Sequence, residues 1–154
     1  MRTSILGLVL AAGLSMVVGC GDDGDGGADL AKFVGTWKYT SGTGTTNCGG
    51  MSETDQLQDT VTINRGIDSP LVQVSGTCTL KMDVTGMTAS ARSGQECSVT
   101  ENGVNVTIKT TAYTFTVNGI VASTSGSATV QASGPGGVAN CTYTETGAMM
   151  KISQ

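Results

Sequence analysis

The chain has 154 residues, a formal net charge of −4, five cysteines and no histidine. Without histidine it lacks the usual base of a serine triad and a common zinc ligand, so we expect neither that enzyme chemistry nor a metal site. Without an excess of Lys and Arg it lacks the basic patch that neutralises phosphates, which argues against a nucleic-acid partner. No motif for a dissociable cofactor is present.

An apolar leader follows Arg2 and occupies residues 5–18. Its length of about 14 residues fits the core of a signal peptide and is too short for a transmembrane helix, which needs about 20. The run Val17-Val18-Gly19-Cys20 resembles the lipobox of bacterial lipoproteins. The resemblance implies cleavage after residue 19, a covalent lipid on Cys20 and a membrane anchor at the cell envelope. Gly21, in place of Asp, favours the outer over the inner membrane.

The rest of the chain divides into a short tether and one domain. Residues 20–28 hold Cys20 and then a Gly/Asp-rich run with no large apolar side chain, which predicts a flexible, solvated tether. Residues 29–154 are of single-domain size. At their start, Asp29 is placed to cap one helical turn over residues 30–33.

Nearly every later segment alternates apolar and polar residues with period two, and Asn-Gly or Gly-rich turns separate the segments. This pattern predicts antiparallel strands with one buried face. We expect eight to ten separate strands, because some of the predicted segments will merge. Closure into an all-β, up-and-down barrel would remove the exposed edges, and a β-sandwich is the alternative. The predicted segments are residues 35–42, 57–64, 71–76, 77–84, 86–91, 95–101, 104–110, 112–118, 120–124, 127–132, 138–145 and 148–153.

The first predicted strand begins with Gly35-Thr36-Trp37, directly after the capped turn. This stretch resembles the first signature of lipocalins and related calycin barrels. The resemblance implies a barrel whose closed end is plugged by Trp37, with a basic residue of the last strand packed on the indole. Lys151 is the basic residue in that region, where the family usually has arginine. The second signature of the family is absent, since Thr110-Thr111-Ala112-Tyr113 lacks its acidic residue.

Four cysteines remain after Cys20, and an even number in an exported domain predicts two disulfides. Three pairings are open, and we predict Cys78–Cys97 and Cys48–Cys141. Cys78 and Cys97 flank a hairpin centred between residues 87 and 88, and both would face inward. Cys48 follows the first strand and Cys141 lies in one of the last two, which a closed barrel brings together.

Two functions fit these features. The first is a lipid-anchored cup that holds a small apolar ligand, with Tyr39 and Tyr143 either lining the cavity or packing as core residues. The second is a structural or interaction lipoprotein with a solid interior and no ligand. The acidic residues Glu53, Asp55 and Asp59 could in principle form a hydrolase carboxylate pair, but loop acids are expected to be a solvated face. We therefore expect a protein that is not an enzyme.

Overall fold

The computed structural model describes residues 29–101 and 103–154. The predicted signal peptide, the lipidation site Cys20 and the tether fall outside these residues. In the described part of the chain no helix has the length and apolar character needed to cross a membrane. One 3-10 turn, η1 (Leu30–Lys32), precedes the strands, and Asp29 caps it by accepting a 3.1 Å hydrogen bond from the backbone N–H of Ala31.

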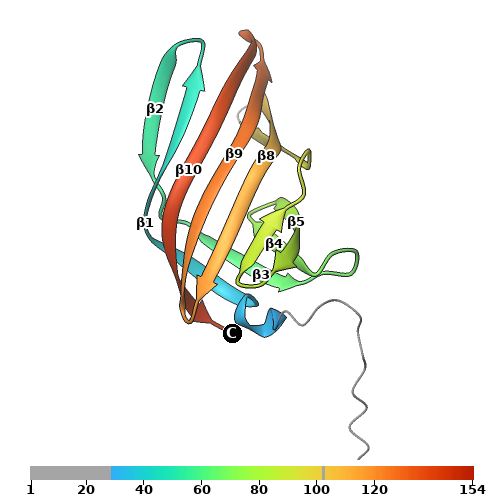
Figure 1. Cartoon of the computed structure of the whole chain (residues 1–154). Coiled ribbons are helices and arrows are strands. Elements are labelled where there is room, and N and C mark those ends of the chain that lie inside the picture. Colours follow the sequence, from blue (N-terminus) through green and yellow to red (C-terminus); the bar gives the residue numbers. More distant parts are fainter. Residues whose placement is uncertain (1–28, 102) are drawn as a thin grey trace, which may run out of the picture.

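Ten strands follow η1 (Figure 1). They are β1 (Gly35–Cys48), β2 (Met51–Gln56), β3 (Thr60–Arg65), β4 (Leu71–Ser75), β5 (Cys78–Thr85), β6 (Thr88–Ala91), β7 (Glu96–Glu101), β8 (Val104–Asn118), β9 (Val121–Gly134) and β10 (Gly137–Ser153).

Eight of the strands form a closed ring. Their order is β1, β3, β4, β5, β6, β8, β9 and β10, each antiparallel to the next, and β10 pairs back with β1. Neighbours in the ring follow one another in the sequence, so the predicted up-and-down barrel is confirmed and the sandwich alternative is not observed. The two remaining strands extend this ring, β2 by pairing with β1 and β7 by pairing with β8.

The strand boundaries differ from the prediction in two ways. The first strand continues to Cys48 and turns through Gly49-Gly50 into β2, a hairpin that was not predicted. Strands β8, β9 and β10 are each continuous where two shorter strands were predicted. Gly126 and Gly147, which fall between predicted segments, lie inside β9 and β10, where the absence of a side chain makes room for neighbouring rings.

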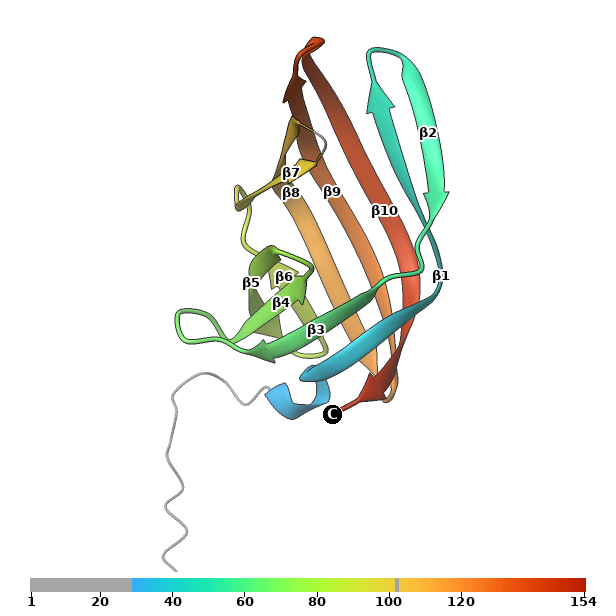
Figure 2. The same ribbon diagram turned by 180° about the vertical axis from the view of Figure 1, so that it is seen from behind.

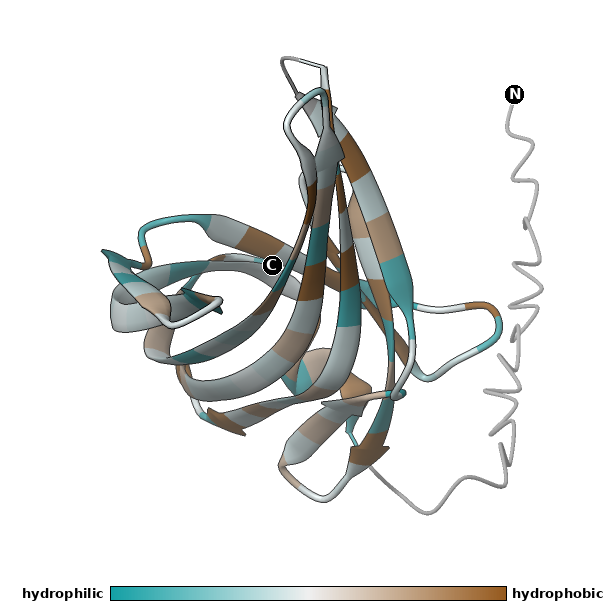
Figure 3. Cartoon of the chain, turned by 90° about the horizontal axis from the view of Figure 1, so that it is seen from above, coloured by the Kyte–Doolittle hydropathy of each residue, from teal (hydrophilic) through white to brown (hydrophobic). Residues whose placement is uncertain are grey.

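Alternation of apolar and polar residues along the strands produces the core. Figure 3, seen from above, shows hydrophobic and more polar residues following one another along the strands. The core fills one end of the barrel, and its largest fully buried side chains are Trp37, Phe33, Phe115, Ile63, Leu71, Met82 and Met149. Figures 1 and 2 place η1 beside this closed end, together with the chain's C-terminus.

Trp37 is the centre of the closed end. Its indole N–H donates a 2.8 Å hydrogen bond to the carbonyl of Phe33, and its ring meets Phe115 edge-on with centroids 5.0 Å apart. Lys151 Nζ lies 5.5 Å from the centre of the indole and donates hydrogen bonds to the carbonyls of Ala31 and Lys32. The basic side chain therefore ties the turn η1 to the tryptophan, in the arrangement that the lipocalin resemblance implies.

Gly35 lies under this contact with a φ of +137°, a conformation that disfavours any side chain. A Cβ atom at this position would collide with the carbonyl oxygen of Ser153 and lie 2.7 Å from Lys151 Cε. The glycine is thus required for β1 and the end of β10 to approach each other below the tryptophan.

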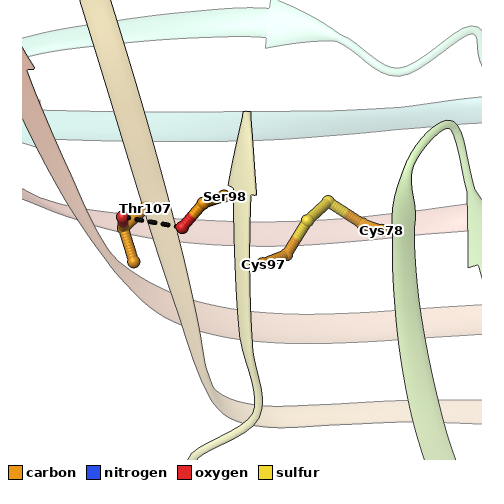
Figure 4. Close-up of a disulfide and its surroundings, with 4 residues drawn as sticks. All are labelled: Cys78, Cys97, Ser98 and Thr107. Atoms are coloured by element: carbon orange, nitrogen blue, oxygen red, sulfur yellow. Dashed lines mark hydrogen bonds between the residues drawn. A yellow bond between two sulfur atoms is a disulfide. The ribbon is translucent and has the colours of Figure 1, made fainter. Parts of the chain in front are cut away.

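Both predicted disulfides are confirmed. Cys48 and Cys141 stand directly opposite each other on β1 and β10 with Cα atoms 4.3 Å apart, although Cys48 is the last residue of β1 and does not follow it. Cys78 and Cys97 join β5 to β7 with Cα atoms 5.5 Å apart (Figure 4).

The reason given for the second pair was wrong, because β7 pairs with β8 and not with β5. The hairpin of β5 and β6 ends at Ala91. The side chain of Gln95 then occupies the next position beside β5, bonding the N–H and the carbonyl of Lys81 at 2.7 and 2.9 Å. The chain leaves toward β8 after Gln95, and the disulfide spans the gap that this departure creates.

Candidate binding cavity

A cavity of about 490 Å³ occupies the barrel above the packed core. Its walls come from the inward faces of the barrel strands, with Leu57 and Asp59 from the segment between β2 and β3 and Cys97 from β7. The apolar part of the lining consists of Leu57, Val61, Leu80, Ile108, Ala112, Ala128 and Val130. The polar part includes Tyr39, Tyr113, Tyr143, Glu145, Gln73, Thr110 and Asp59. Ser75 and the Cys78–Cys97 disulfide line the side away from the core, which we call the mouth.

Glu145 connects two tyrosines of the adjacent strands β1 and β10 along the cavity wall. Tyr39 donates a 3.1 Å hydrogen bond to one carboxylate oxygen, and Tyr143 donates a 2.8 Å hydrogen bond to the other. Tyr143 and Glu145 are two residues apart on β10, so they point to the same face, while Tyr39 lies on the neighbouring strand β1. The carboxylate is half-buried, and these two hydroxyl groups hold it in place.

Inward-facing glycines make room for the three tyrosine rings. A Cβ atom at Gly44 would meet Tyr143, one at Gly126 would meet Tyr113, and one at Gly147 would meet Tyr39, each within 3 Å. The glycines flank Glu145 because Gly44 and Gly126 are its direct neighbours on β1 and β9. The rings therefore lie close to the barrel wall, which leaves the middle of the barrel open.

Within the part of the chain that the structure describes, two buried polar atoms in the cavity lining lack hydrogen-bond partners. They are the hydroxyl of Tyr113 and the side-chain oxygen of Gln73, both on residues that are 6% exposed. The two side chains are neighbours, since Gln73 influences the pKa of Tyr113, but no hydrogen bond of acceptable geometry joins these two atoms. An unsatisfied buried polar group costs about 1–3 kcal/mol, so its presence needs a reason.

The cavity holds the tyrosines in their neutral form. Burial, followed by the charge of Glu145, raises the pKa of Tyr39 to about 12. The same two causes raise the pKa of Tyr143, and burial is again the main cause of the raised pKa of Tyr113. Ionising any of these phenols would place a second negative charge beside the carboxylate.

We expect the protein to lose stability at alkaline pH for this reason. A pKa that is higher in the folded than in the unfolded chain stabilises the fold below about pH 10, and this contribution is lost as pH rises through the folded pKa of about 12 for Tyr39. The chain has three tyrosines and all line the cavity. Tyrosinate absorbance should therefore rise well above pH 10 in the folded protein and near pH 10 in denaturant. Coincident titrations would contradict the burial of these hydroxyl groups.

Among residues 29–101 and 103–154, the cavity lining contains acidic but no basic side chains. Asp59 and Glu145 line it, and the charge of Asp55 on β2 contributes to the raised pKa of Tyr143. Of the acids weighed from sequence, Glu53 and Asp55 lie exposed on β2, while Asp59 is exposed but reaches the cavity. The segment that holds Glu53, Asp55 and Asp59 thus forms part of the surroundings of the cavity.

A second hollow of about 690 Å³ lies over β1, β8, β9 and β10. Strand register places its side chains Asn47, Thr107, Lys109, Thr129 and Thr142 on the face opposite to the barrel interior. Its charged pair, Lys109 and Glu96, is joined by a 3.0 Å salt bridge with both side chains more than half exposed. The hollow carries no buried unpartnered group among the described residues, so the barrel interior is the stronger candidate.

Sequence reasoning found part of this arrangement. It named Tyr39 and Tyr143, and the structure brings both to the cavity. It missed Glu145, Gln73 and the role of Tyr113. The alternation Tyr143, Glu145, Gly147 along one strand face was the available signal for Glu145, since it places a carboxylate among inward-facing residues.

No family model matches the chain, and no curated protein matches it. Among solved structures it is similar to a protein of unknown function of the DUF3598 family from Nostoc punctiforme, with 12% identity and a TM-score of 0.35. The match covers 80% of this chain and 49% of that one, so the chain spans about half the length of that protein. A likeness of this size supports no conclusion about function.

Proposed function

We propose that this protein is a lipid-anchored lipoprotein of the cell envelope whose barrel binds a small, largely apolar ligand. The observation that carries the proposal is the cavity of about 490 Å³ inside a closed barrel. Pockets for small molecules measure about 300–1,000 Å³ and combine apolar walls with a few polar groups, as this one does. We propose binding without catalysis.

The division of the barrel into a packed end and a hollow end supports binding. Trp37, Phe33 and Phe115 close one end, while small side chains such as Ala112 and Ala128 keep the other open. The alternative function, a structural lipoprotein with a solid interior, gives no reason for this space or for the unpartnered hydroxyl of Tyr113.

The anchor would hold the barrel by its closed end. Asp29 begins the described chain beside η1, at the end sealed by Trp37. Eight residues, 21–28, separate Asp29 from the predicted lipid-bearing Cys20, and the nine Cα–Cα steps between them span at most about 30 Å. The mouth would then point away from the membrane that carries the lipid. Two disulfides agree with a location outside the cytoplasm.

Binding can be tested with the uncharged fluorophore Nile red and one blocking variant. Ala128 is buried in the cavity wall, so Ala128→Phe should fill the space and lower the affinity for Nile red at least ten-fold. The matched control is Ser125→Phe, which adds the same ring to the exposed face of the same strand. Circular dichroism melts confirm that both variants fold. Equal Nile red affinity in the two variants would contradict binding inside the barrel.

The anchor can be tested by metabolic labelling with a palmitate analogue. We expect the wild-type protein to be labelled and to fractionate with membranes, and Cys20→Ser to lose both properties. Lipid on the Cys20→Ser variant would exclude the lipobox interpretation, since no other described cysteine is free of a disulfide.

A further inference from the structure

The polar groups of the cavity offer mainly hydrogen-bond acceptors. A carboxylate has about four lone-pair positions, and Tyr39 and Tyr143 occupy one on each oxygen of Glu145. The side-chain oxygen of Gln73 is a further acceptor, buried and unpartnered. Tyr113 lines the same cavity and lies near both groups, since both Glu145 and Gln73 influence its pKa. A ligand that donates several hydrogen bonds would satisfy this cluster.

The charge around the cluster has one sign. Asp59 and Glu145 line the cavity, and Asp55 lies near Tyr143. No lysine or arginine is among the lining residues that the structure describes. The three salt bridges within the described residues join other acids, so Glu145 has no cationic partner there. Lys151 points the opposite way, toward Trp37 and η1. A partly buried carboxylate gains most from a cation that shares its environment.

We propose, on the basis of the proposed binding function, that the ligand of this cavity is an amphipathic amine. Its protonated amino group binds Glu145, with Gln73 and Tyr113 as further hydrogen-bonding groups. Its apolar chain lies against the wall formed by Leu57, Val61, Leu80, Ile108 and Val130.

Chemistry favours this class over two others. An alkylammonium group supplies three donors and no acceptor, which matches a cluster rich in acceptors. The faces of Tyr39, Tyr113 and Tyr143 also attract cations. A fatty-acid carboxylate would face Glu145 and two aspartates without a basic partner. A neutral alcohol could bond Gln73 or Tyr113, but it would leave the charge of Glu145 uncompensated.

Three probes of equal chain length test the proposal by calorimetric titration of the purified protein: octylamine, octanoate and octanol. We expect octylamine to bind at least ten-fold more tightly than either of the others. Glu145→Gln keeps the size of the side chain and removes its charge, so it should lower octylamine affinity at least ten-fold and leave octanol affinity within two-fold. Glu96→Gln on the outer face makes the same change in net charge and should leave all three affinities unchanged.

The outcomes separate the two proposals. Octanoate or octanol binding as tightly as octylamine would overturn the amine proposal while upholding a ligand-binding barrel. No binding of any probe, together with no binding of Nile red, would overturn both. An equal loss of octanol and octylamine affinity in Glu145→Gln would mean that the variant disturbs the cavity. In that case Glu145→Asp, which retains the charge, must restore the preference for octylamine over octanol. If it does not, the amine proposal fails.

Discussion

Replacing Trp37 by alanine should lower the free energy of unfolding by about 3–5 kcal/mol, the range measured for large buried aromatic residues. The indole is fully buried, packs edge-on against Phe115 and donates a 2.8 Å hydrogen bond to the carbonyl of Phe33. Its removal would also take away the ring under Lys151. For a domain of this size the loss corresponds to a fall in Tm of roughly 10–20 °C. Urea denaturation monitored by circular dichroism measures this loss. Tryptophan fluorescence cannot serve, because the chain has one tryptophan and the variant removes it.

Trp37→Phe is the matched control. It keeps an aromatic ring near Phe115 and loses the N–H that bonds the Phe33 carbonyl. It should therefore lower the free energy of unfolding clearly less than Trp37→Ala does. If Trp37→Ala melted within a few degrees of the wild type, the closed end would not depend on this residue and the packing described for η1 would be wrong.

The closed end was predictable because its residues are local in the sequence and chemically distinctive. Asp29, Gly35 and Trp37 fall within nine residues, and each has a distinctive role. Asp29 caps the turn, Gly35 adopts a positive φ, and Trp37 buries its ring. Lys151 could be added as the basic residue near the end of the chain. The cap and the hydrogen bond from Trp37 to the Phe33 carbonyl are local and independent of strand register, whereas the contact with Lys151 arises because Lys151 is paired directly opposite Trp37 on β10.

The cavity cluster could not be predicted in the same way because it depends on register between distant strands. Glu145 lies between Gly44 and Gly126, which are 101 and 19 residues away along the chain. A shift of one residue in either pairing would turn the glycine away from the interior. The sequence alternation shows which residues share a face, but not which glycine meets which tyrosine.

The bulge between Thr110 and Ala112 in β8 adds to this difficulty, because it changes the alternation within a continuous strand. Val106 and Ile108 face inward before the bulge, and Tyr113 and Phe115 face inward after it, so even and odd positions exchange roles. From sequence the exchange was interpreted as a break between two strands. Because of the same bulge, the sequence alternation did not show that Tyr113 lines the same cavity as Ile108.

The two disulfides should differ in what they stabilise. Cys48–Cys141 has a sequence separation of 93 residues and Cys78–Cys97 one of 19. The entropic model assigns about 4.6 kcal/mol to a loop of the first size and about 3 kcal/mol to the second. Cys48→Ala/Cys141→Ala should therefore unfold at a lower denaturant concentration than Cys78→Ala/Cys97→Ala, measured by urea titration of both double variants beside the wild type.

Ligand affinity should follow the opposite order, because the two bonds lie in different places. Cys48 and Cys141 join strands that are already paired along their length, whereas Cys78 and Cys97 join strands with no backbone pairing between them and line the cavity. Loss of Cys78–Cys97 removes the covalent link between β5 and β7 at the mouth and should weaken Nile red binding several-fold. Loss of Cys48–Cys141 should leave Nile red binding nearly unchanged. If the Cys48→Ala/Cys141→Ala variant lost as much affinity while still folded, the mouth would not be held by the bond between β5 and β7. The wall of the cavity would then depend on the β1–β10 closure instead.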